Sequence, residues 1–215
     1  MTTAQPVTPV HSYLSLRWII GGLTITLPLV LVIWEFISCE CGDIGGSISG
    51  YYDSAAGDYF VGAVFAIGIF LFTYRGYAKR AEDKEWLTDD TAGNLTCIFL
   101  IGVALLPSSG DGWIGQAHLA FAALSFAMLA YFCLVLFVKS GGSLTNLKRR
   151  RNRVYRTCGA IIALCIVLIG AYLLFLQDEE SISDLSPVFW LEWLALWAFG
   201  ISWFVKGKAL RRFKL

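Results

Sequence analysis

The sequence predicts an all-α fold: a polytopic transmembrane bundle of six helices, formed by one domain over residues 1–215. Hydrophobic residues make up 57% of the chain and charged residues 15%, with a mean hydropathy of +0.64. Ordinary soluble domains do not have this balance. All 17 Lys and Arg residues fall on one side when the apolar segments are threaded alternately across a bilayer. Such a bias marks the cytoplasmic side, so we expect both termini there and a loop cap on the opposite side.

The first three spans are predicted at 18–38, 59–77 and 92–107. The third is the shortest, and the other five are about 19 to 25 residues long, enough to cross a core of ~30 Å at ~1.5 Å per residue. Pro28 predicts a kink in the first span, and Pro107 predicts the end of the third, because proline interrupts the helical hydrogen-bond ladder.

The last three spans are predicted at 114–138, 156–176 and 187–205. A basic loop separates the fourth from the fifth, and its run KRRRNR at 148–153 lies directly before a span. We interpret this run as a topology anchor that touches anionic headgroups, so no nucleic-acid partner is expected. Small residues four positions apart predict close helix contacts in two spans. These pairs are Gly62 with Ala66, and Gly159 with Ala163.

Two connections are more than linkers. The first outer one, CECGDIGGSISGYYDSAAGDYF, is rich in Gly and Ser and long enough to fold back over the mouth of the bundle. We expect Tyr51 and Tyr52 to lie inward as a lid, with a hydroxyl or the Asp53 carboxylate reaching polar residues below. The inner one, AKRAEDKEWLTDD at 78–90, predicts a short surface helix that ends near Asp89.

The six cysteines do not predict a disulfide framework. Cys39 and Cys41 form a C-x-C pair, a spacing that strains a disulfide, and no zinc-site partners follow them. The other four lie inside predicted spans, where cysteine is a small apolar filler. They are Cys97, Cys133, Cys158 and Cys165. We therefore expect no metal site and no cofactor.

Ionisable groups inside a bilayer cost roughly 2.5–3.5 kcal/mol on insertion scales, which makes each one a candidate for function. Glu35, His118 and Glu192 lie about 5 to 8 Å inside the outer ends of three different spans, at the rise of a helix. Asp58 lies at the outer mouth of the second span, and Ser125 shares the helix face of His118. We expect His118 and Glu192 to approach within direct or single-water hydrogen-bond reach. The predicted ligand pocket consists of Glu35, Tyr51, Tyr52, Asp53, Asp58, His118, Ser125 and Glu192.

Several classes of membrane site are excluded by residues that the chain lacks. Only His118 lies in a predicted span, since His11 is in the N-terminal tail, so paired axial imidazoles for haem and a three-histidine zinc hydrolase are both excluded. A retinal Schiff base needs a lysine in mid-span, whereas Lys139 and Lys206 lie at span ends. No phosphate-binding loop, dinucleotide glycine motif or G-x-S-x-G sequence is present.

Three stretches, SISGYYDSAAGDYFVGAVFAIGIFLFTYRGY, RNRVYRTCG and FWLEWLALWAFGISWFVKG, resemble a family of bacterial six-span membrane proteins without an assigned reaction. In outline that family is similar to autophagy-modulator-type six-span proteins. The resemblance implies the six-span fold and its topology. The chain departs from the pattern at Asp53, where a histidine is usual, and at Gly57, where an arginine is usual; the first departure weakens the idea of a metal site. The likeness is most specific at Tyr51, Tyr52, Asp58, Gly62, His118, Asn152, Glu192 and Trp197.

Three functions remain open at this point. The favoured one is a non-catalytic accessory or lipid-responsive protein of a plasma or bacterial inner membrane, with membrane lipids and other membrane subunits as partners. The second is a small transporter or channel that uses Glu35, Glu192 and His118 as an ion or proton site. The third is a lipid hydrolase, with His118 as general base and Glu192 or Asp58 orienting it. A purely structural polar cluster is the alternative to all three.

Overall fold

The computed structural model describes residues 13–38, 45–74, 87–139 and 145–207, and every regular element in these ranges is a helix. Cys39, Cys41 and the inner connection at 78–86 lie outside the described residues. The short elements are a 3₁₀ helix (η1), a π-helix (η2) and the one-turn α6. The elements are α1 Tyr13–Ser38, η1 Ser49–Asp53, α2 Gly57–Phe72, α3 Asp89–Leu105, α4 Trp113–Tyr131, η2 Phe132–Leu136, α5 Asn146–Phe175, α6 Glu180–Ser183 and α7 Pro187–Lys206.

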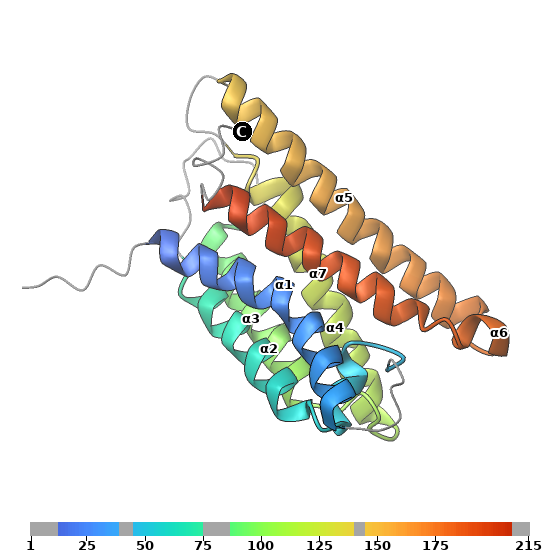
Figure 1. Ribbon diagram of the computed structural model, residues 1–215. Coiled ribbons are helices and arrows are strands. Elements are labelled where there is room, and N and C mark those ends of the chain that lie inside the picture. The colour runs from blue at the N-terminus through green and yellow to red at the C-terminus, as the bar shows by residue number, and fades with distance from the viewer. Residues whose placement is uncertain (1–12, 39–44, 75–86, 140–144, 208–215) are drawn as a thin grey trace, which may run out of the picture.

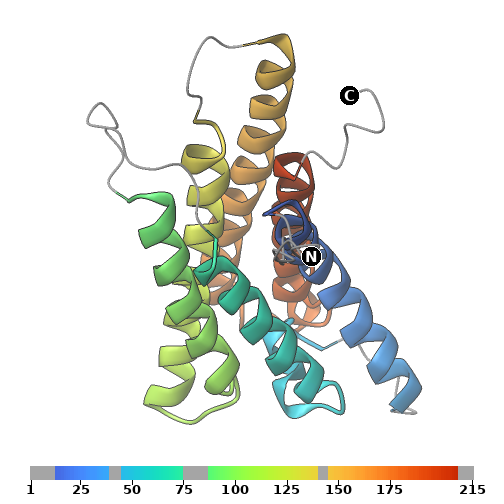
Figure 2. The ribbon, with the colours of Figure 1, turned by 90° about the vertical axis from the view of Figure 1, so that its left-hand side faces the viewer.

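In the described part of the chain, six long helices form a bundle in which successive helices run in opposite directions (Figures 1 and 2). The main packing partners are α2 with α3, α3 with α4, and α7 with both α1 and α5. In Figure 2 the green α3 and α4 lie side by side, and the blue α1 lies on the other side of the bundle. One end of the bundle therefore carries the start of α1 and the finish of α7. The other end carries η1 and the start of α7.

Four helices among the described residues are long and apolar enough to cross a membrane. They are Ser15–Ser38, Trp113–Leu136, Asn146–Phe175 and Glu180–Lys206. The helix Gly57–Phe72 is apolar but shorter, and α3 has 17 residues. The helix α5 begins at Asn146, ahead of the predicted span. The basic run at 148–153 is therefore helical and forms the first turns of α5.

Local sequence signals explain where several helices begin. The side chains of Thr88 and Thr145 lie at the N-caps of α3 and α5 and accept hydrogen bonds from the backbone N–H groups of Thr91 and Lys148. Pro187 occupies the first turn of α7, where its missing N–H is not needed. These residues therefore determine where α3, α5 and α7 begin.

Glycine allows the closest approach between helices, and the predicted pairs are only half right. A Cβ at Gly159 would lie 2.5 Å from Leu134 Cγ, so this glycine does admit its neighbour, but Gly62 faces open space. The contact that the sequence did not indicate is between α1 and α7. There a Cβ on Gly21 would meet the carbonyl oxygen of Gly200 at 3.1 Å, and one on Gly200 would meet that of Gly21 at 3.0 Å.

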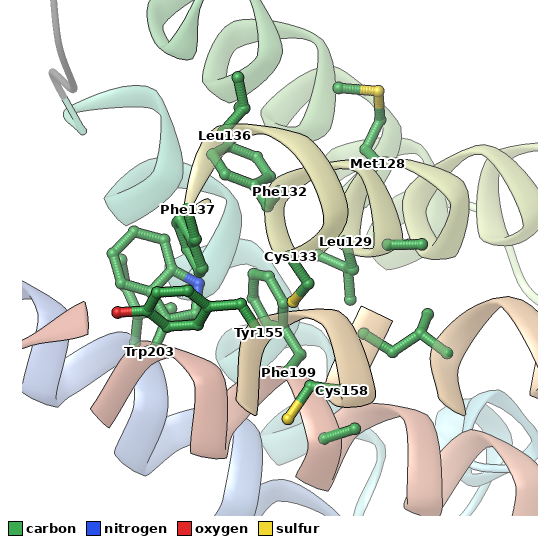
Figure 3. Packing of buried hydrophobic residues seen from close by; sticks show 14 of the residues in the cluster. Met128, Leu129, Phe132, Cys133, Leu136, Phe137, Tyr155, Cys158, Phe199 and Trp203 are labelled. Atoms are coloured by element: carbon green, nitrogen blue, oxygen red, sulfur yellow. The ribbon is translucent and has the colours of Figure 1, made fainter. Parts of the chain in front are cut away.

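Two clusters of buried residues fill the bundle. The larger one, which we call the aromatic core, surrounds the fully buried Trp203 near the end where α7 finishes. Figure 3 shows Phe132, Phe137 and Tyr155 gathered with Trp203. The smaller cluster lies near the end where α7 begins and combines Leu27, Leu31, Phe60 and Phe189 with residues from the loop around η1. This smaller cluster is where the candidate site lies.

Candidate ligand pocket beneath a folded cap

Residues 45–56, which we call the cap, fold into a compact segment around η1. The turn begins with the N–H of Gly50 bonded to the carbonyl of Ser47 at 3.2 Å, and the N–H of Ser54 bonds to Tyr51 O at 3.1 Å. The cap passes directly into α2 at Gly57, where a Cβ would lie only 2.2 Å from the carbonyl oxygen of Tyr52. Only glycine fits this junction, so the arginine that the family pattern would place there is incompatible with this turn.

The cap is fastened to α7 through backbone groups. The N–H of Ile48 donates to Glu192 Oε2 at 2.6 Å, and the N–H of Phe189 donates to the carbonyl of Gly46 at 3.2 Å. Ile48 is the N-cap residue of η1, so Glu192 accepts from one of the N–H groups that a helix start leaves without a partner. The buried carboxyl of Glu192, 7% exposed, is thus tied to the cap.

The connection between α3 and α4 holds the other side of the cap. The hydroxyl of Ser108 donates to the carbonyl of Ser49 at 3.1 Å. The hydroxyl of Ser109 donates to the carboxylate of Asp53. These two serines were not among the residues singled out from the sequence. The only available signal was the turn sequence PSSG, which indicates a loop and not a contact.

Tyr51 lies inward as expected, with 2% of its surface exposed and its ring centroid 6.1 Å from that of Phe189. Its hydroxyl accepts from the N–H of Gly45 at 3.4 Å, and so contacts the cap itself and not the polar residues below. Burial raises the pKa of the Tyr51 hydroxyl, the Gly45 N–H opposes this rise, and the charge of Glu35 adds to it. Tyr52 is half-buried, with its ring 6.5 Å from Phe60.

A cavity lies between the helices directly beneath the cap. The empty space between its lining residues comprises about 450 Å³, part of which opens to the surroundings. Its wall is formed by α1, the cap, α2, α3, α4 and α7, and almost all of it is aliphatic or aromatic. The polar side chains in the wall are Ser49, Ser125 and Glu192. Two of the predicted pocket residues, Ser125 and Glu192, are thus brought together.

Ser125 is 3% exposed, and its hydroxyl has no hydrogen-bond partner among the residues that the structure describes. A buried hydroxyl without a partner is costly, so such groups in a folded protein need an explanation. Because this hydroxyl belongs to a residue of the cavity wall, a ligand or water in the cavity would supply the missing partner.

His118 and Glu192 were expected within direct or single-water hydrogen-bond reach, and no direct hydrogen bond joins them. His118 is buried, and its Nδ1 lies 2.7 Å from the carbonyl oxygen of Leu106, while Glu192 binds Ile48. Leu106 is the C-cap of α3, and the last carbonyls of a helix have no partner within it, so His118 satisfies one of them. The Nε2 of His118 is buried without a partner, and the residue is not part of the cavity wall.

The remaining predicted residues lie apart from the cavity wall. Asp53 and Asp58 are exposed, and Asp58 lies in the first turn of α2, where a carboxylate favours the helix start. Glu35 is half-buried near Tyr51, with one carboxyl oxygen enclosed and unpartnered. Within the described ranges, no group of three or more His, Cys, Asp or Glu residues is placed to hold a metal ion.

Comparison with known proteins finds no counterpart for this arrangement: no family model, curated protein or solved structure matches the chain. The function of the protein is therefore inferred from the geometry of the cap, the cavity and its polar side chains.

Proposed function

We propose that this chain is an integral membrane protein that binds the apolar part of an amphiphile in the cavity beneath its cap, and that it acts by binding and not by catalysis. The observation that supports this most is the cavity wall, which is apolar except for Glu192, the unpartnered Ser125 and Ser49. Ligand sites have this composition: mostly hydrophobic walls with a few placed polar groups.

Binding is favoured over the two alternatives by specific contacts. The hydrolase hypothesis needs His118 oriented by Glu192 or Asp58, but these three residues have separate surroundings. The transporter hypothesis needs a path through the bundle, but the aromatic core around Trp203 fills the end opposite the cap. A cavity that is closed at one end suits a protein that holds a ligand.

We further propose that all six long helices cross the membrane, with the cap on the outer side and both termini in the cytoplasm. Their alternating directions support this count, although α2 and α3, with 16 and 17 residues, are at the short limit for a span. The distribution of the 17 basic residues supports the orientation.

Cysteine labelling of intact cells tests the orientation. Asn146→Cys and Ser181→Cys place exposed thiols at opposite ends of the bundle, in a background where Cys39 and Cys41 are serine. An impermeant maleimide is expected to label position 181 in intact cells and position 146 only after permeabilisation. Labelling in the reverse order would overturn the proposed orientation.

Thermal unfolding of the purified full-length protein in nanodiscs, with and without dodecan-1-ol, tests the binding function. A ligand at 100 times its dissociation constant stabilises the bound state by about 2.7 kcal/mol, which corresponds to several degrees in Tm. Ala122→Phe fills the cavity, whereas Ala123→Phe places the same ring on the exposed face of α4 and is the matched control.

The expected result is a rise in Tm with dodecan-1-ol for the wild type and Ala123→Phe, and none for Ala122→Phe. If Ala122→Phe itself unfolds, Val64→Leu reduces the same cavity by a smaller volume and is expected to weaken the response. Equal responses from all variants would mean that the alcohol acts through the bilayer, and the proposed function would be wrong.

A further inference from the structure

We infer that the cavity selects an amphiphile whose head donates hydrogen bonds and carries no negative charge, a long-chain alcohol or a long-chain amine. This inference depends on the proposed function and adds the chemical class of the ligand. The hydrogen-bonding groups that line the cavity determine which head group it can accept.

Within the described ranges, no cationic side chain lines the cavity. Its wall includes thirteen residues, and none of them is Lys, Arg or His. A carboxylate or phosphate head would therefore enter a largely apolar space without an opposing charge, which is strongly unfavourable. It would also meet the carboxyl of Glu192, and two acidic groups in one low-dielectric site repel each other.

The polar groups of the cavity are mainly acceptors. An ionised carboxyl only accepts, with about four lone-pair positions on its two oxygens, and Ile48 occupies one of them on Oε2 of Glu192. The Ser49 amide also faces this carboxyl, so part of its capacity is used by the cap. The rest is available to a donor in the cavity.

Ser125 adds a hydroxyl that can accept two hydrogen bonds and donate one. It is 97% enclosed by the protein, and its oxygen has no partner, so a ligand head at this position would satisfy a group that the protein leaves unsatisfied. Ser125 is on α4 and Glu192 is on α7, and both contribute to the same wall. A hydroxyl or ammonium head at either residue would satisfy an acceptor of this wall.

His118 places another acceptor on the same face of α4, about two turns from Ser125. A carbonyl oxygen can only accept, so Nδ1 of His118 carries the proton that binds Leu106 O. In the neutral ring Nε2 then has a lone pair, and this buried atom has no donor. This atom lies outside the cavity wall, so the choice of ligand head depends on Glu192 and Ser125.

Three probes with the same twelve-carbon chain test the inference: dodecan-1-ol, dodecylamine and dodecanoate. Each is added at pH 7.5 to the full-length protein in nanodiscs, and the response is the rise in Tm of the wild type minus that of Ala122→Phe. This difference removes effects on the bilayer. The alcohol and the amine are expected to give a positive difference, and dodecanoate at least tenfold weaker binding.

The outcomes separate the two proposals. Equal responses to the three probes, or the strongest response to dodecanoate, would overturn the selectivity and leave the binding function standing. No response to any of them would overturn the binding function itself.

Two variants then assign the selectivity to residues. Glu192→Gln removes the charge and is expected to lower the affinity for dodecylamine relative to dodecan-1-ol by about tenfold, while Glu180→Gln on the exposed α6 changes neither. Ser125→Ala is expected to weaken the binding of both probes without lowering the Tm of the protein alone, because the hydroxyl has no partner to lose. An unchanged preference for the amine in Glu192→Gln would overturn the role of Glu192, and undiminished binding in Ser125→Ala would overturn that of Ser125.

Discussion

At the end of the bundle where α7 finishes, aromatic rings fill the interior, whereas at the end where α7 begins, hydrogen bonds close the interior over a cavity. Trp203 lies 5.0 Å from the ring of Tyr74 and 5.1 Å from that of Phe137, edge to face. The cap instead depends on bonds such as that between Ile48 and Glu192. Packed aromatic rings fill the interior, whereas hydrogen bonds can join two segments and leave space between them. One end of the molecule can therefore be densely packed while the other end has room for a ligand.

The largest effect is expected at the filled end. Trp203→Ala removes a fully buried side chain from the aromatic core and should lower the free energy of unfolding by about 3–5 kcal/mol, since the surrounding rings cannot close the space. The measurement is thermal or denaturant unfolding in detergent. Trp190→Ala, on the same helix but half exposed, is the control and should change stability by far less. Similar losses from both variants would contradict the contrast between the two ends.

A smaller, local effect is expected at the cap. Glu192→Ala leaves the N–H of Ile48 without its acceptor, at a cost of about 1–3 kcal/mol for a buried unsatisfied group. Hydrogen–deuterium exchange should then become faster in residues 48–53, while the amides around Trp203 keep their protection. Glu192→Gln retains an acceptor oxygen and should keep most of the protection. Uniform exchange changes along the whole chain would show that the cap is not a separate unit.

The smallest effect is the pH dependence of the cap. The pKa of Tyr51 is raised above 10.0, chiefly by burial. The folded state therefore holds this proton more tightly, and the stability due to Tyr51 is fully present below pH 10 and is lost as the pH rises through the raised value. Tyr51→Phe loses only the weak bond to Gly45, about 0.5–1.5 kcal/mol, and has no phenol to titrate.

The difference in Tm between wild type and Tyr51→Phe should therefore stay constant up to about pH 10 and narrow as the pH rises above it. The two proteins differ only at this hydroxyl, so the comparison isolates the Tyr51 ring. A constant difference over this range would mean that burial does not hold the Tyr51 proton.

The positions of the long helices could be predicted because each depends on a run of apolar residues that the sequence displays. The predicted span at 187–205 coincides almost fully with α7, and the inward position of Tyr51 follows from its size and amphipathic ring. The predicted span at 156–176 covers the apolar part of α5, and the helix extends ten residues ahead of it because hydropathy marks the apolar segment and not the whole helix.

The partners of the polar residues could not be predicted in the same way. Equal depth in a membrane does not fix the direction in which a side chain points, so the sequence could not show that His118 and Glu192 bind different partners. The actual partners are backbone groups, the carbonyl of Leu106 and the N–H of Ile48. Every residue except proline carries the same backbone N–H, so the sequence does not indicate which N–H donates to Glu192.

The attachment of Ile48 to Glu192 has a consequence for how the protein can vary. Its N–H holds the cap, while its side chain belongs to the cavity wall. A substitution at position 48 by any residue except proline keeps the N–H that the attachment uses and changes the surface that a ligand meets. A substitution at position 48 can therefore change which ligand the cavity prefers while the hydrogen bond that attaches the cap to α7 stays in place. Evolution could alter ligand preference at this position without altering the attachment of the cap.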